Sequence, residues 1–497
     1  MVELSRSSEH LRALFDPAGV VVVGASTHPG KFGFVALHNI LASGYQGSVF
    51  ATNLEGETVL GVQTVPSIAD LPPGPIDLAV ICTPASTNQA ILRACAARGI
   101  RAAFITSAGY GEAGEAGIEQ QRVLIDLANE LGVLVAGPNG QGLVSTPSKL
   151  CAQIVAPYPP AGNIGIASQS GNFVSSFQNW SVGSGIGVSR SVSAGNAAMV
   201  TVADYLAFYA SDPATKVGLA YVEGIADGRA FANRIADVTR QMPLVLVKGG
   251  STEGGQAAAA SHTGALAAND RVFDGMCRQL GVSRARTVEE AFDAAAAFAT
   301  QPLPHGPHVA VLTTAGGWGV VTSDAITEDP DLVLMPLPID LRASIDTKLP
   351  PRWSRSNPVD LAGAETRDTI PEVMELMAAH PDVHAIVYLG IGIQSNQAKL
   401  TRAGGFFPDH GLDRIVAFHE RQDARYAQAA HDLSVRYGKP ILTATELAVA
   451  DPSNPGPATV RATGRYCFPT ANRAVTALGH LYRRSRFEQR RAGEQTR

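Results

Sequence analysis

The chain of 497 residues has little cysteine for its length. Its five cysteines are Cys82, Cys95, Cys151, Cys277 and Cys467, and no CxxC spacing occurs among them. An odd number of widely separated thiols argues against a disulfide framework or a zinc site, and it fits a reducing compartment. The histidines are scattered without ligand spacing, so the sequence predicts no bound metal ion.

Long apolar runs and an excess of basic charge are also missing. No uninterrupted apolar stretch approaches the ~18 residues that span a bilayer. The charged start, Met1 to Arg6, lacks the apolar core of a signal peptide. The net charge of −5 argues against a dedicated nucleic-acid binder. The sequence therefore predicts a soluble cytoplasmic protein that binds neither a membrane nor a nucleic acid.

The chain is instead rich in apolar residues and in loop formers. Apolar residues make up 45%, which excludes wholesale disorder. The 50 glycines and 31 prolines indicate many tight loops between short elements. Division of the length by about 150 residues per domain predicts roughly three domains.

Three stretches share one plan, in which a β-branched strand leads through a loop of small residues into a helix. They are 19–26, 163–171 and 308–317. Such an opening begins a βαβ unit, so three of them predict three α/β domains. Further continuous apolar runs, typical of parallel strands covered on both faces, occur at 77–82, 101–106, 216–221, 244–248, 384–389 and 414–418.

Proline-rich joints at 156–162 and 301–307 stand directly before the second and third openings. Linkers have this composition, so the joints predict domain boundaries. The expected domains are 1–156, 157–303 and 304–482, followed by a basic tail at 483–497.

The first loop, from Gly24 to Gly33, is a candidate anion site. Backbone N–H groups and the start of a helix can hold a phosphate there. Ser26 and Pro29 stand where the GxGxxG fingerprint has glycines, which disfavours an NAD-dependent oxidoreductase. Small residues also follow the next strands, at 83–85 and 107–110, and leave a crevice of the kind that binds ligands. A tight turn without a ligand stays open as the alternative.

Short motifs of small and polar residues continue through all three domains. They are Gly24-Ala25-Ser26 with Asn53, Thr83-Pro84-Ala85, Ser107-Ala108-Gly109-Tyr110-Gly111-Glu112, Gly137-Pro138-Asn139, Ser168-Gln169-Ser170-Gly171, Ser193-Ala194-Gly195-Asn196, Tyr221-Val222-Glu223-Gly224-Ile225, Lys248-Gly249-Gly250, Ser261-His262-Thr263-Gly264-Ala265, Thr313-Thr314-Ala315-Gly316-Gly317 and Asn357-Pro358-Val359-Asp360-Leu361. In this order, from about residue 10 to about residue 480, the chain resembles the nucleoside-diphosphate-forming acyl-CoA synthetases. These include the ADP-forming acetate–CoA ligases and the α subunit of succinyl-CoA synthetase.

The resemblance implies a Rossmann-like CoA-binding domain followed by two flavodoxin-like, doubly wound domains. It also implies CoA contacts at Gly24, Ala25, Ser26, Lys31, Asn53, Thr83, Pro84, Ser107 and Gly109. Two positions depart from the family pattern. Gly140 stands where the family usually has a cysteine, and Glu55 follows Asn53 where many members have a lysine that can meet the CoA 3′-phosphate.

His262 is the expected phosphoryl acceptor. It lies in a stretch, 249–265, that has several glycines and no large apolar residue. A neutral imidazole is nucleophilic and titrates near physiological pH. The loop alone favours a surface or capping histidine, but the resemblance implies one that is transiently phosphorylated. In the same way Glu223, at a strand end, is expected to orient that imidazole, whereas a solvated glutamate is the alternative.

A strand-to-helix turn is expected to hold the phosphoryl group, because hydroxyls and N–H groups at a helix start suit its oxygens. The residues of this turn are Ser168, Gln169, Ser170 and Gly171. An N-cap role for Ser170 is compatible with it. Asn139, Gly195 and Asn196 are further candidate phosphate or acyl-phosphate contacts, with turn formation as the open alternative.

Together these features predict the α-type subunit of an ADP-forming acyl-CoA synthetase. The resemblance implies that a carboxylic acid, CoA and ATP are interconverted with acyl-CoA, ADP and phosphate, through an acyl phosphate and a phosphohistidine. No ATP-grasp module is evident in the sequence. A separate β-type subunit is therefore expected to carry ATP or ADP with Mg²⁺ in a hetero-oligomer. The alternative is a non-catalytic CoA-binding or regulatory protein of the same fold.

Overall fold

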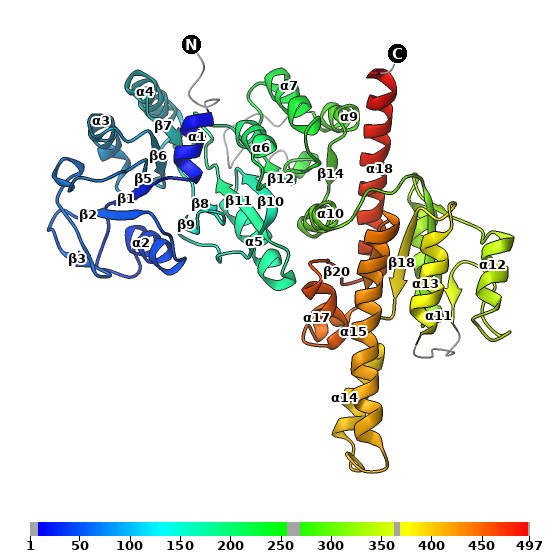
Figure 1. Cartoon of the computed structure of the whole chain (residues 1–497). Helices are drawn as coiled ribbons and strands as arrows, with labels where there is room; N and C mark the ends of the chain where they lie inside the picture. Colours follow the sequence, from blue (N-terminus) through cyan, green and yellow to red (C-terminus); the bar gives the residue numbers. More distant parts are fainter. Residues whose placement is uncertain (1–7, 256–268, 362–367, 496–497) are drawn as a thin grey trace. The chain divides into compact units, whose positions relative to one another are not determined.

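The computed structural model describes residues 8–255, 269–361 and 368–495. The chain divides into two compact units, Met1–Gly183 with Gly187–Ala291 and Ser184–Ile186 with Phe292–Arg497 (Figure 1). The first unit contains two large sheets and the second contains one. Parallel strands alternate with helices in each of them, which confirms the predicted α/β fold class.

The first sheet has the order β2-β1-β5-β6-β7, and all its neighbouring strands are parallel. Its strands are β1 (Gly19–Val23), β2 (Ser48–Thr52), β5 (Leu78–Ile81), β6 (Ala102–Ile105) and β7 (Leu134–Ala136). Its helices are α1 (Ser8–Phe15), α2 (Phe32–Ala42), α3 (Asn88–Arg98) and α4 (Glu115–Leu131), and a hairpin of β3 (Thr58–Val59) and β4 (Val62–Gln63) follows β2. The strand order reverses between β1 and β5, which is the switch point of a Rossmann-like sheet.

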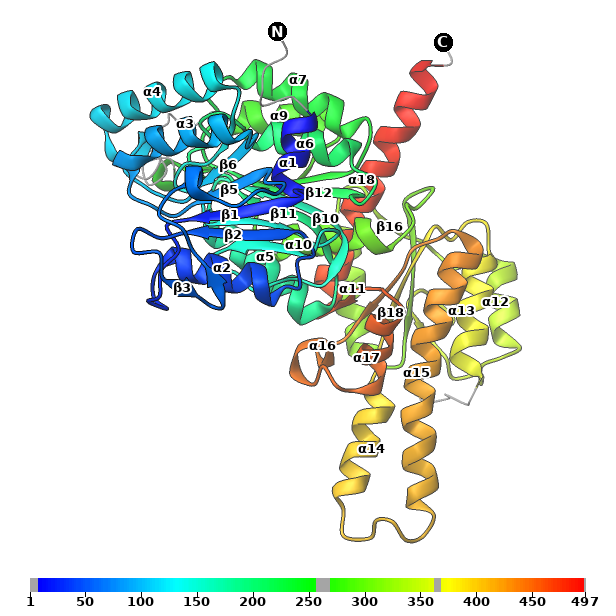
Figure 2. The same cartoon turned by 60° about the vertical axis from the view of Figure 1, so that its left-hand side comes forward.

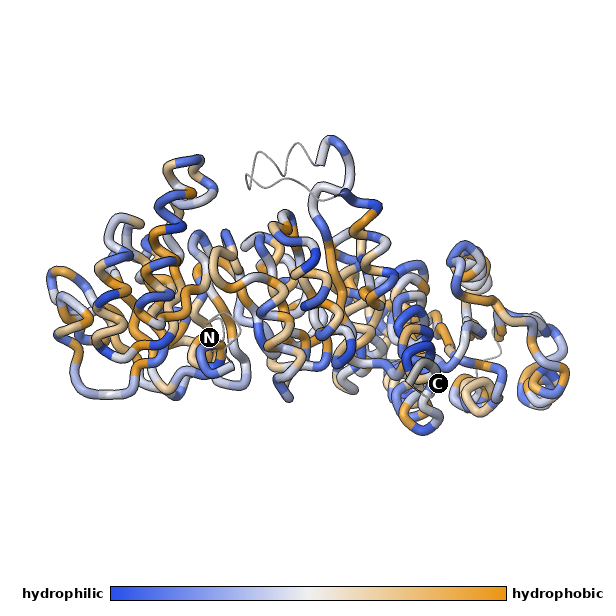
Figure 3. The backbone as a smooth tube through the Cα atoms, turned by 90° about the horizontal axis from the view of Figure 1, so that it is seen from above, coloured by the Kyte–Doolittle hydropathy of each residue, from blue (hydrophilic) through white to orange (hydrophobic). Residues whose placement is uncertain are grey.

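Strand β1 shows why helices cover both faces of this sheet. All its residues are buried, and successive side chains point to opposite faces. Val20 and Val22 lie in one hydrophobic core with Leu37 of α2, whereas Val21 lies in another with Leu92 of α3. In Figure 3, hydrophobic stretches of the backbone, in orange, alternate with hydrophilic ones, in blue.

The second sheet has the order β14-β13-β12-β10-β11-β8-β9. Its strands are β8 (Gly142–Ser145), β9 (Leu150–Gln153), β10 (Ala161–Ser168), β11 (Val188–Ser193), β12 (Val217–Val222), β13 (Leu244–Lys248) and β14 (Ser283–Ala285). Its helices are α5 (Gly171–Ser184), α6 (Val202–Ser211), α7 (Gly228–Thr239) and α9 (Asp270–Leu280). From β10 to β14 the order is that of a flavodoxin-like fold. The antiparallel strands β8 and β9 join this sheet although the predicted boundary, near residue 156, groups them with the first domain.

The third sheet, in the second unit, follows the same order, β16-β15-β18-β19-β20, with β17 also paired to β15. Its strands are β15 (His308–Thr313), β16 (Val333–Leu334), β17 (Val359–Asp360), β18 (Ala385–Leu389), β19 (Ile441–Ala444) and β20 (Cys467–Phe468). Its helices are α11 (Gly316–Glu328), α12 (Ile339–Asp346), α13 (Thr369–Ala379), α14 (Ile393–Ala403), α15 (Leu412–Tyr437), α16 (Leu447–Ala450), α17 (Pro455–Ala462) and α18 (Ala471–Gln495). Helix α10 (Val288–Thr300) contains the point at which the chain passes from the first unit to the second. Figure 2 shows α14 and α15 as a helical hairpin that extends away from this sheet.

Two sequence-based expectations for the second unit differ from the structure. The strand predicted at 414–418 is wrong, because this run is the start of helix α15. Its buried positions continue as Val416, Asp423, Tyr426 and Ala430, at helical spacing. The predicted basic tail from 483 is the last part of α18, where Arg483 pairs with Asp329 and other arginines are also paired. The domain boundaries themselves stay a prediction.

Within the described ranges, no helix combines the length and the apolar composition needed to cross a membrane.

A buried arginine joins the start of the chain to the second sheet. Arg190 of β11 is 4% exposed, and its guanidinium pairs with Asp16 at 2.6 Å and with Asp212 at 2.9 Å. The Asp212 side chain is itself 8% exposed. Removal of one member of a buried ion pair leaves an uncompensated charge, which is far more costly than the loss of a surface pair.

Arg190→Ala is therefore expected to destabilise the first unit by about 3–5 kcal/mol. The measurement is the first transition in urea unfolding, followed by circular dichroism. Arg122→Ala is the control, because the Arg122 side chain is 61% exposed although it pairs with Glu119 and Asp126. Equal urea midpoints for the two variants would contradict the structural role of Arg190.

Candidate active site

The predicted CoA-contact residues gather at the carboxyl edge of the first sheet. Gly24, directly after β1, has a φ of +85°. A Cβ atom added there would lie 2.6 Å from Thr83 Cγ2, which follows β5, so the two loops touch at the switch point. Pro84 comes next on the exposed surface and precedes a short 3₁₀ turn. Ligands of α/β sheets bind in this position.

Asn53, after β2, ties its loop to the loop after β1. Its Nδ2 donates to the Ala25 carbonyl at 2.9 Å, and its Oδ1 accepts from the Glu55 N–H at 2.8 Å. Ser26 Oγ accepts from the His28 N–H at 3.1 Å. Lys31 is exposed at the N-cap of α2, so its ammonium is available beside the start of that helix. The sequence-predicted residues of these two loops are thus brought together.

The loop after β6 contains Glu112, for which the sequence alone predicted no role. Gly109 has a φ of +102°, and the Glu112 carboxylate accepts hydrogen bonds from the N–H groups of Gly109 at 2.5 Å and Tyr110 at 3.1 Å. Its other oxygen accepts from Asn196 Nδ2 at 2.5 Å. Ser107, in the same loop, accepts from Asn88 Nδ2 at 2.9 Å.

Burial would raise the pKa of Glu112, but the hydrogen bonds from Asn196, Gly109 and Tyr110 outweigh it and hold this pKa below its ordinary value. Glu112 is therefore an ionised link between the first and second sheets. The sequence offered one signal, the Tyr-Gly-Glu that ends the motif at 107–112.

Two loops, 137–140 and 193–196, interlock where the two sheets of the first unit meet. Asn196 N–H donates to the Pro138 carbonyl at 3.0 Å, and Asn139 Nδ2 donates to Asn196 Oδ1 at 3.3 Å. A Cβ atom added to Gly195 would lie 2.2 Å from the Pro138 oxygen. The predicted residues Asn139, Gly195 and Asn196 are thus brought together, and their amides already bond to each other.

The turn after β10 has the geometry expected of a helix start that can receive an anion. Ser168 is fully buried, its Oγ donates to the Ser170 carbonyl at 2.7 Å, and it accepts from the Ser170 N–H at 3.1 Å. Helix α5 begins at Gly171, where a Cβ atom would lie 2.1 Å from Gln141 Cδ. The Ser168 hydroxyl therefore stabilises the turn through its bonds to Ser170. The first N–H groups of α5 are the groups that can bind an anion here.

Gln169 connects this turn to Glu223 across the switch point between β10 and β12. Its Oε1 accepts from the N–H groups of Glu223 at 2.5 Å and Gly224 at 3.2 Å, and its Nε2 donates to the Gly224 carbonyl at 3.0 Å. The Gln169 amide thus fixes the backbone of Glu223. A direct contact of Gln169 with phosphate stays a prediction.

His262 lies outside the described residues, but the chain on both sides of it is described. Lys248, the last residue of β13, has a side chain that is 1% exposed. Its Nζ donates to the carbonyls of Gly249 and Gly250 at 3.1 Å and lies 3.8 Å from Asp270. Burial lowers the pKa of Lys248, and Asp270 opposes this effect. Lys248 therefore holds the backbone just before the segment 251–269, whereas Asp270, just after that segment, pairs more closely with Arg284, at 2.5 Å.

In the second unit, the turn after β15 has the same hydrogen bonds as the turn after β10 in the first unit. Thr313 Oγ1 donates to the Ala315 carbonyl at 2.9 Å and accepts from the Ala315 N–H at 3.0 Å, and α11 begins at Gly316. Beside this edge lies a pocket of about 310 Å³ to which Trp318 and Leu389 contribute. The repeated opening is visible in the sequence, but the sequence alone predicts no site there.

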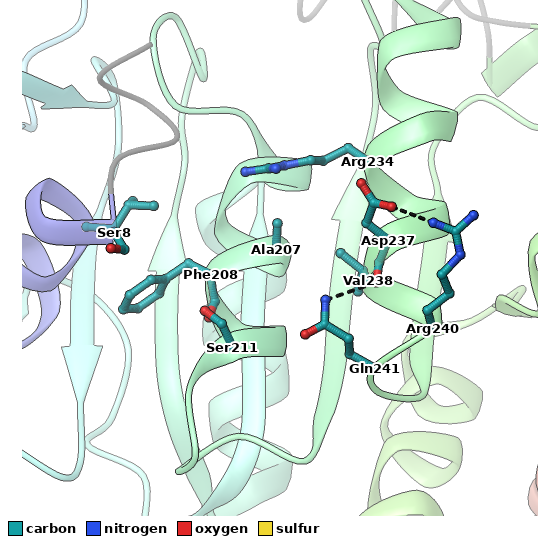
Figure 4. Close-up of a pocket in the computed structure, with 10 residues that line it drawn as sticks. Ser8, Ala207, Phe208, Ser211, Arg234, Asp237, Val238, Arg240 and Gln241 are labelled. Carbon is teal, nitrogen blue, oxygen red and sulfur yellow. Dashed lines mark hydrogen bonds and ion pairs between the residues drawn. The ribbon is translucent and has the colours of Figure 1, made fainter. Parts of the chain in front are cut away.

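A larger pocket in the first unit, of about 430 Å³, lies away from the predicted residues (Figure 4). Arg234 and Asp237 of α7 line it together with Ala207 and Ser211 of α6. These positions belong to the carboxyl halves of both helices, which adjoin the amino edge of the sheet. This pocket is therefore separate from the turn at Ser168.

Comparison with known proteins identifies each part of the chain. Residues 19–145 match a CoA binding domain, residues 161–298 a succinyl-CoA ligase-like flavodoxin domain, and residues 309–394 a ligase-CoA domain. The α subunit of acetate–CoA ligase (ADP-forming) I from Pyrococcus furiosus is 36% identical over 383 residues, which are 76% of this chain and 82% of that protein.

Two further comparisons extend this result. The 4-hydroxybutyrate–CoA ligase (ADP-forming) of Nitrosopumilus maritimus is 32% identical over 378 residues, 75% of this chain and 54% of that protein. The dinucleotide forming acetyl-coenzyme A synthetase 1 of Ca. Korarchaeum cryptofilum, solved with phosphate and ADP, has a TM-score of 0.82 and 30% identity. This match covers 96% of our chain and 97% of that one.

The chain belongs to the family of ADP-forming acyl-CoA ligases. Within it the chain is of the α type, since it matches most of an α subunit but about half of the longer 4-hydroxybutyrate enzyme. The resemblance seen in the sequence is thus confirmed, as are the ligase class and the use of CoA and of ATP or ADP. The alternative of a non-catalytic CoA-binding protein is not favoured.

Glu112→Gln is expected to make folding stability less dependent on pH. Because the folded-state pKa of Glu112 is depressed, its stabilising contribution is present above the unfolded value of about 4.5 and is lost as the pH falls through the folded value. The difference in urea midpoint between the native chain and the variant should therefore shrink below about pH 5.

The matched control is Glu130→Gln, which changes an exposed carboxylate at the end of α4. A difference between native chain and Glu112→Gln that stays constant down to about pH 2 would contradict an ionised Glu112.

Proposed function

We propose that the carboxyl edge of the second sheet is where a phosphoryl group passes between an acyl phosphate and His262. The observation that carries this proposal is the meeting of three features at that edge. The Ser168–Gly171 turn and Glu223 flank the switch point, and the segment that contains His262 follows the end of the neighbouring strand β13 at Lys248. A turn with free helix N–H groups, a carboxylate and a nucleophilic imidazole are the groups that this chemistry requires.

The reaction begins with acyl-CoA and inorganic phosphate. An oxygen of phosphate attacks the thioester carbonyl, the carbon–sulfur bond breaks, and the CoA sulfur takes the proton that phosphate gives up. A nitrogen of His262 then attacks the phosphorus of the acyl phosphate, and the carboxylic acid leaves as its carboxylate. Transfer from His262 to the terminal phosphate of ADP yields ATP, and the ligase direction runs in reverse.

Each step depends on positioning and on charge neutralisation. The N–H groups at the start of α5 receive the phosphoryl oxygens, and Asn139 and Asn196 contact the acyl phosphate. Glu223 accepts a hydrogen bond from one imidazole nitrogen, so that the other nitrogen is free to attack. The loops after β1, β5 and β6 hold CoA at the first sheet, with Lys31 near its phosphates.

A second subunit with an ATP-grasp fold supplies the nucleotide and Mg²⁺. The naming of the Pyrococcus furiosus relative as an α subunit supports a partner of this kind. Mg²⁺ would neutralise the charge of the nucleotide phosphates on that partner. A small carboxylic acid is the substrate, and the cytoplasm is the site of action.

The central prediction is an acid-labile phosphate on His262. The chain, co-purified with an ATP-grasp subunit and incubated with ATP labelled in the γ-phosphate, should acquire label that is lost in acid and kept in base. His262→Asn should abolish it, and addition of CoA with the substrate acid should remove it from the native chain. Acid-stable label, or label that survives in His262→Asn, would refute the proposal.

Replacement of the orienting carboxylate provides a separate test. Glu223→Gln should slow phosphorylation of His262 by about 100-fold or more, because a neutral amide no longer stabilises the imidazolium that develops. Rapid-quench measurement of the labelling rate checks this, with binding of CoA unchanged. Glu253→Gln, which changes an exposed carboxylate shortly after β13, is the control. A labelling rate within twofold of the native one would exclude the assigned role of Glu223.

A further inference from the structure

Tyr221 occupies a position in the second sheet that the reaction described above does not use. It is the second-last residue of β12, and it is 7% exposed. Glu223 stands two residues later, in the bend that follows this strand. The Tyr221 hydroxyl lies near the Glu223 carboxylate, whose charge raises the pKa of this phenol.

The ring of Tyr221 is held rigidly from the side of the phosphate turn. Phe173, in the first turn of α5, stacks on it with ring centroids 3.7 Å apart and an interplanar angle of 14°. The strand register places Tyr221 opposite Ser168 on one side and Val247 on the other. The hydroxyl therefore has a fixed direction relative to the start of α5.

The end of the neighbouring strand β13 leaves room for the Tyr221 hydroxyl and the Glu223 carboxylate. Gly249 follows β13, and a Cβ atom added to it would lie 2.6 Å from the Tyr221 hydroxyl oxygen and 3.3 Å from Glu223 Cγ. The two groups therefore converge on the space that a side chain at position 249 would take. Any larger residue there would push the hydroxyl away from the carboxylate.

We infer that Tyr221 is a positioning residue that fixes the carboxylate of Glu223 for its work on the phosphoryl-accepting imidazole, an inference that rests on the proposed function. Gln169 fixes the backbone of Glu223, and the Tyr221 hydroxyl fixes its carboxylate by occupying one acceptor site. The remaining carboxylate sites are then presented in one orientation. Without the hydroxyl the carboxylate rotates, and fewer of its orientations meet the imidazole.

The protonation state of Tyr221 suits this task. Burial, and in second place the nearby Glu223 carboxylate, raise the pKa of Tyr221 well above its ordinary value. The phenol therefore stays protonated and acts as a donor throughout the neutral range.

The test replaces Tyr221 by phenylalanine in the chain co-purified with its ATP-grasp partner. Tyr221→Phe keeps the ring that stacks on Phe173 and removes only the hydroxyl. We expect the rate of His262 labelling and kcat to fall about tenfold, as for the loss of a hydrogen bond to a charged group. The KM values for CoA and for the acid should stay within twofold.

Tyr209→Phe is the matched control. Tyr209 is a buried tyrosine of the same domain, and its hydroxyl donates to the Ile166 carbonyl at 3.0 Å, away from the turn at Ser168. This variant should lose stability but keep the native kcat. An equal fall of kcat in both variants, or native labelling by Tyr221→Phe, would overturn the inference. Absence of label in the native chain would instead refute the proposed function, whatever Tyr221→Phe does.

Discussion

The parallel pairing of β10, β12 and β13 is the constraint on which the candidate active site depends. Ser168 stands opposite Tyr221, and Tyr221 stands opposite Val247, so three strands end side by side. Neighbouring strands lie about 4.8 Å apart, which brings the residues after each end within side-chain reach of the next. Gln169 can therefore bond to the backbone of Glu223, although 54 residues separate them along the chain.

Several polar contacts join the two sheets of the first unit. The Asn196 N–H bonds to the Pro138 carbonyl, Glu112 bonds to Asn196, and Arg190 pairs with Asp16. These links cross between the two sheets at places far apart in the sequence. They oppose independent motion of the CoA-binding and flavodoxin-like parts.

The sequence predicted the fold well because its signals are local. Strands such as Leu78–Ile81 are continuous apolar runs, and each turn that starts a domain follows a β-branched strand. The error at 414–418 arose because Ile415 to Phe418 is also such a run, and only the buried positions farther along α15 reveal a helix. The family motifs located the loops of the candidate site. They could not show that the Gln169 amide bonds to backbone, or that Glu112 and Tyr221 take part, since these contacts join separate strand ends.

One departure from the family pattern has an explanation in packing. Behind Gly140 lies the ring of Phe104, and a Cβ atom at position 140 would come within 2.6 Å of that ring and of the Ser193 carbonyl oxygen. Phe104 is fully buried, so its ring cannot move aside without displacing other core residues. The Phe104 ring thus fills the volume that a side chain at position 140 would need. A cysteine at position 140 would therefore require a smaller residue at position 104 and a shift of the main chain at Ser193.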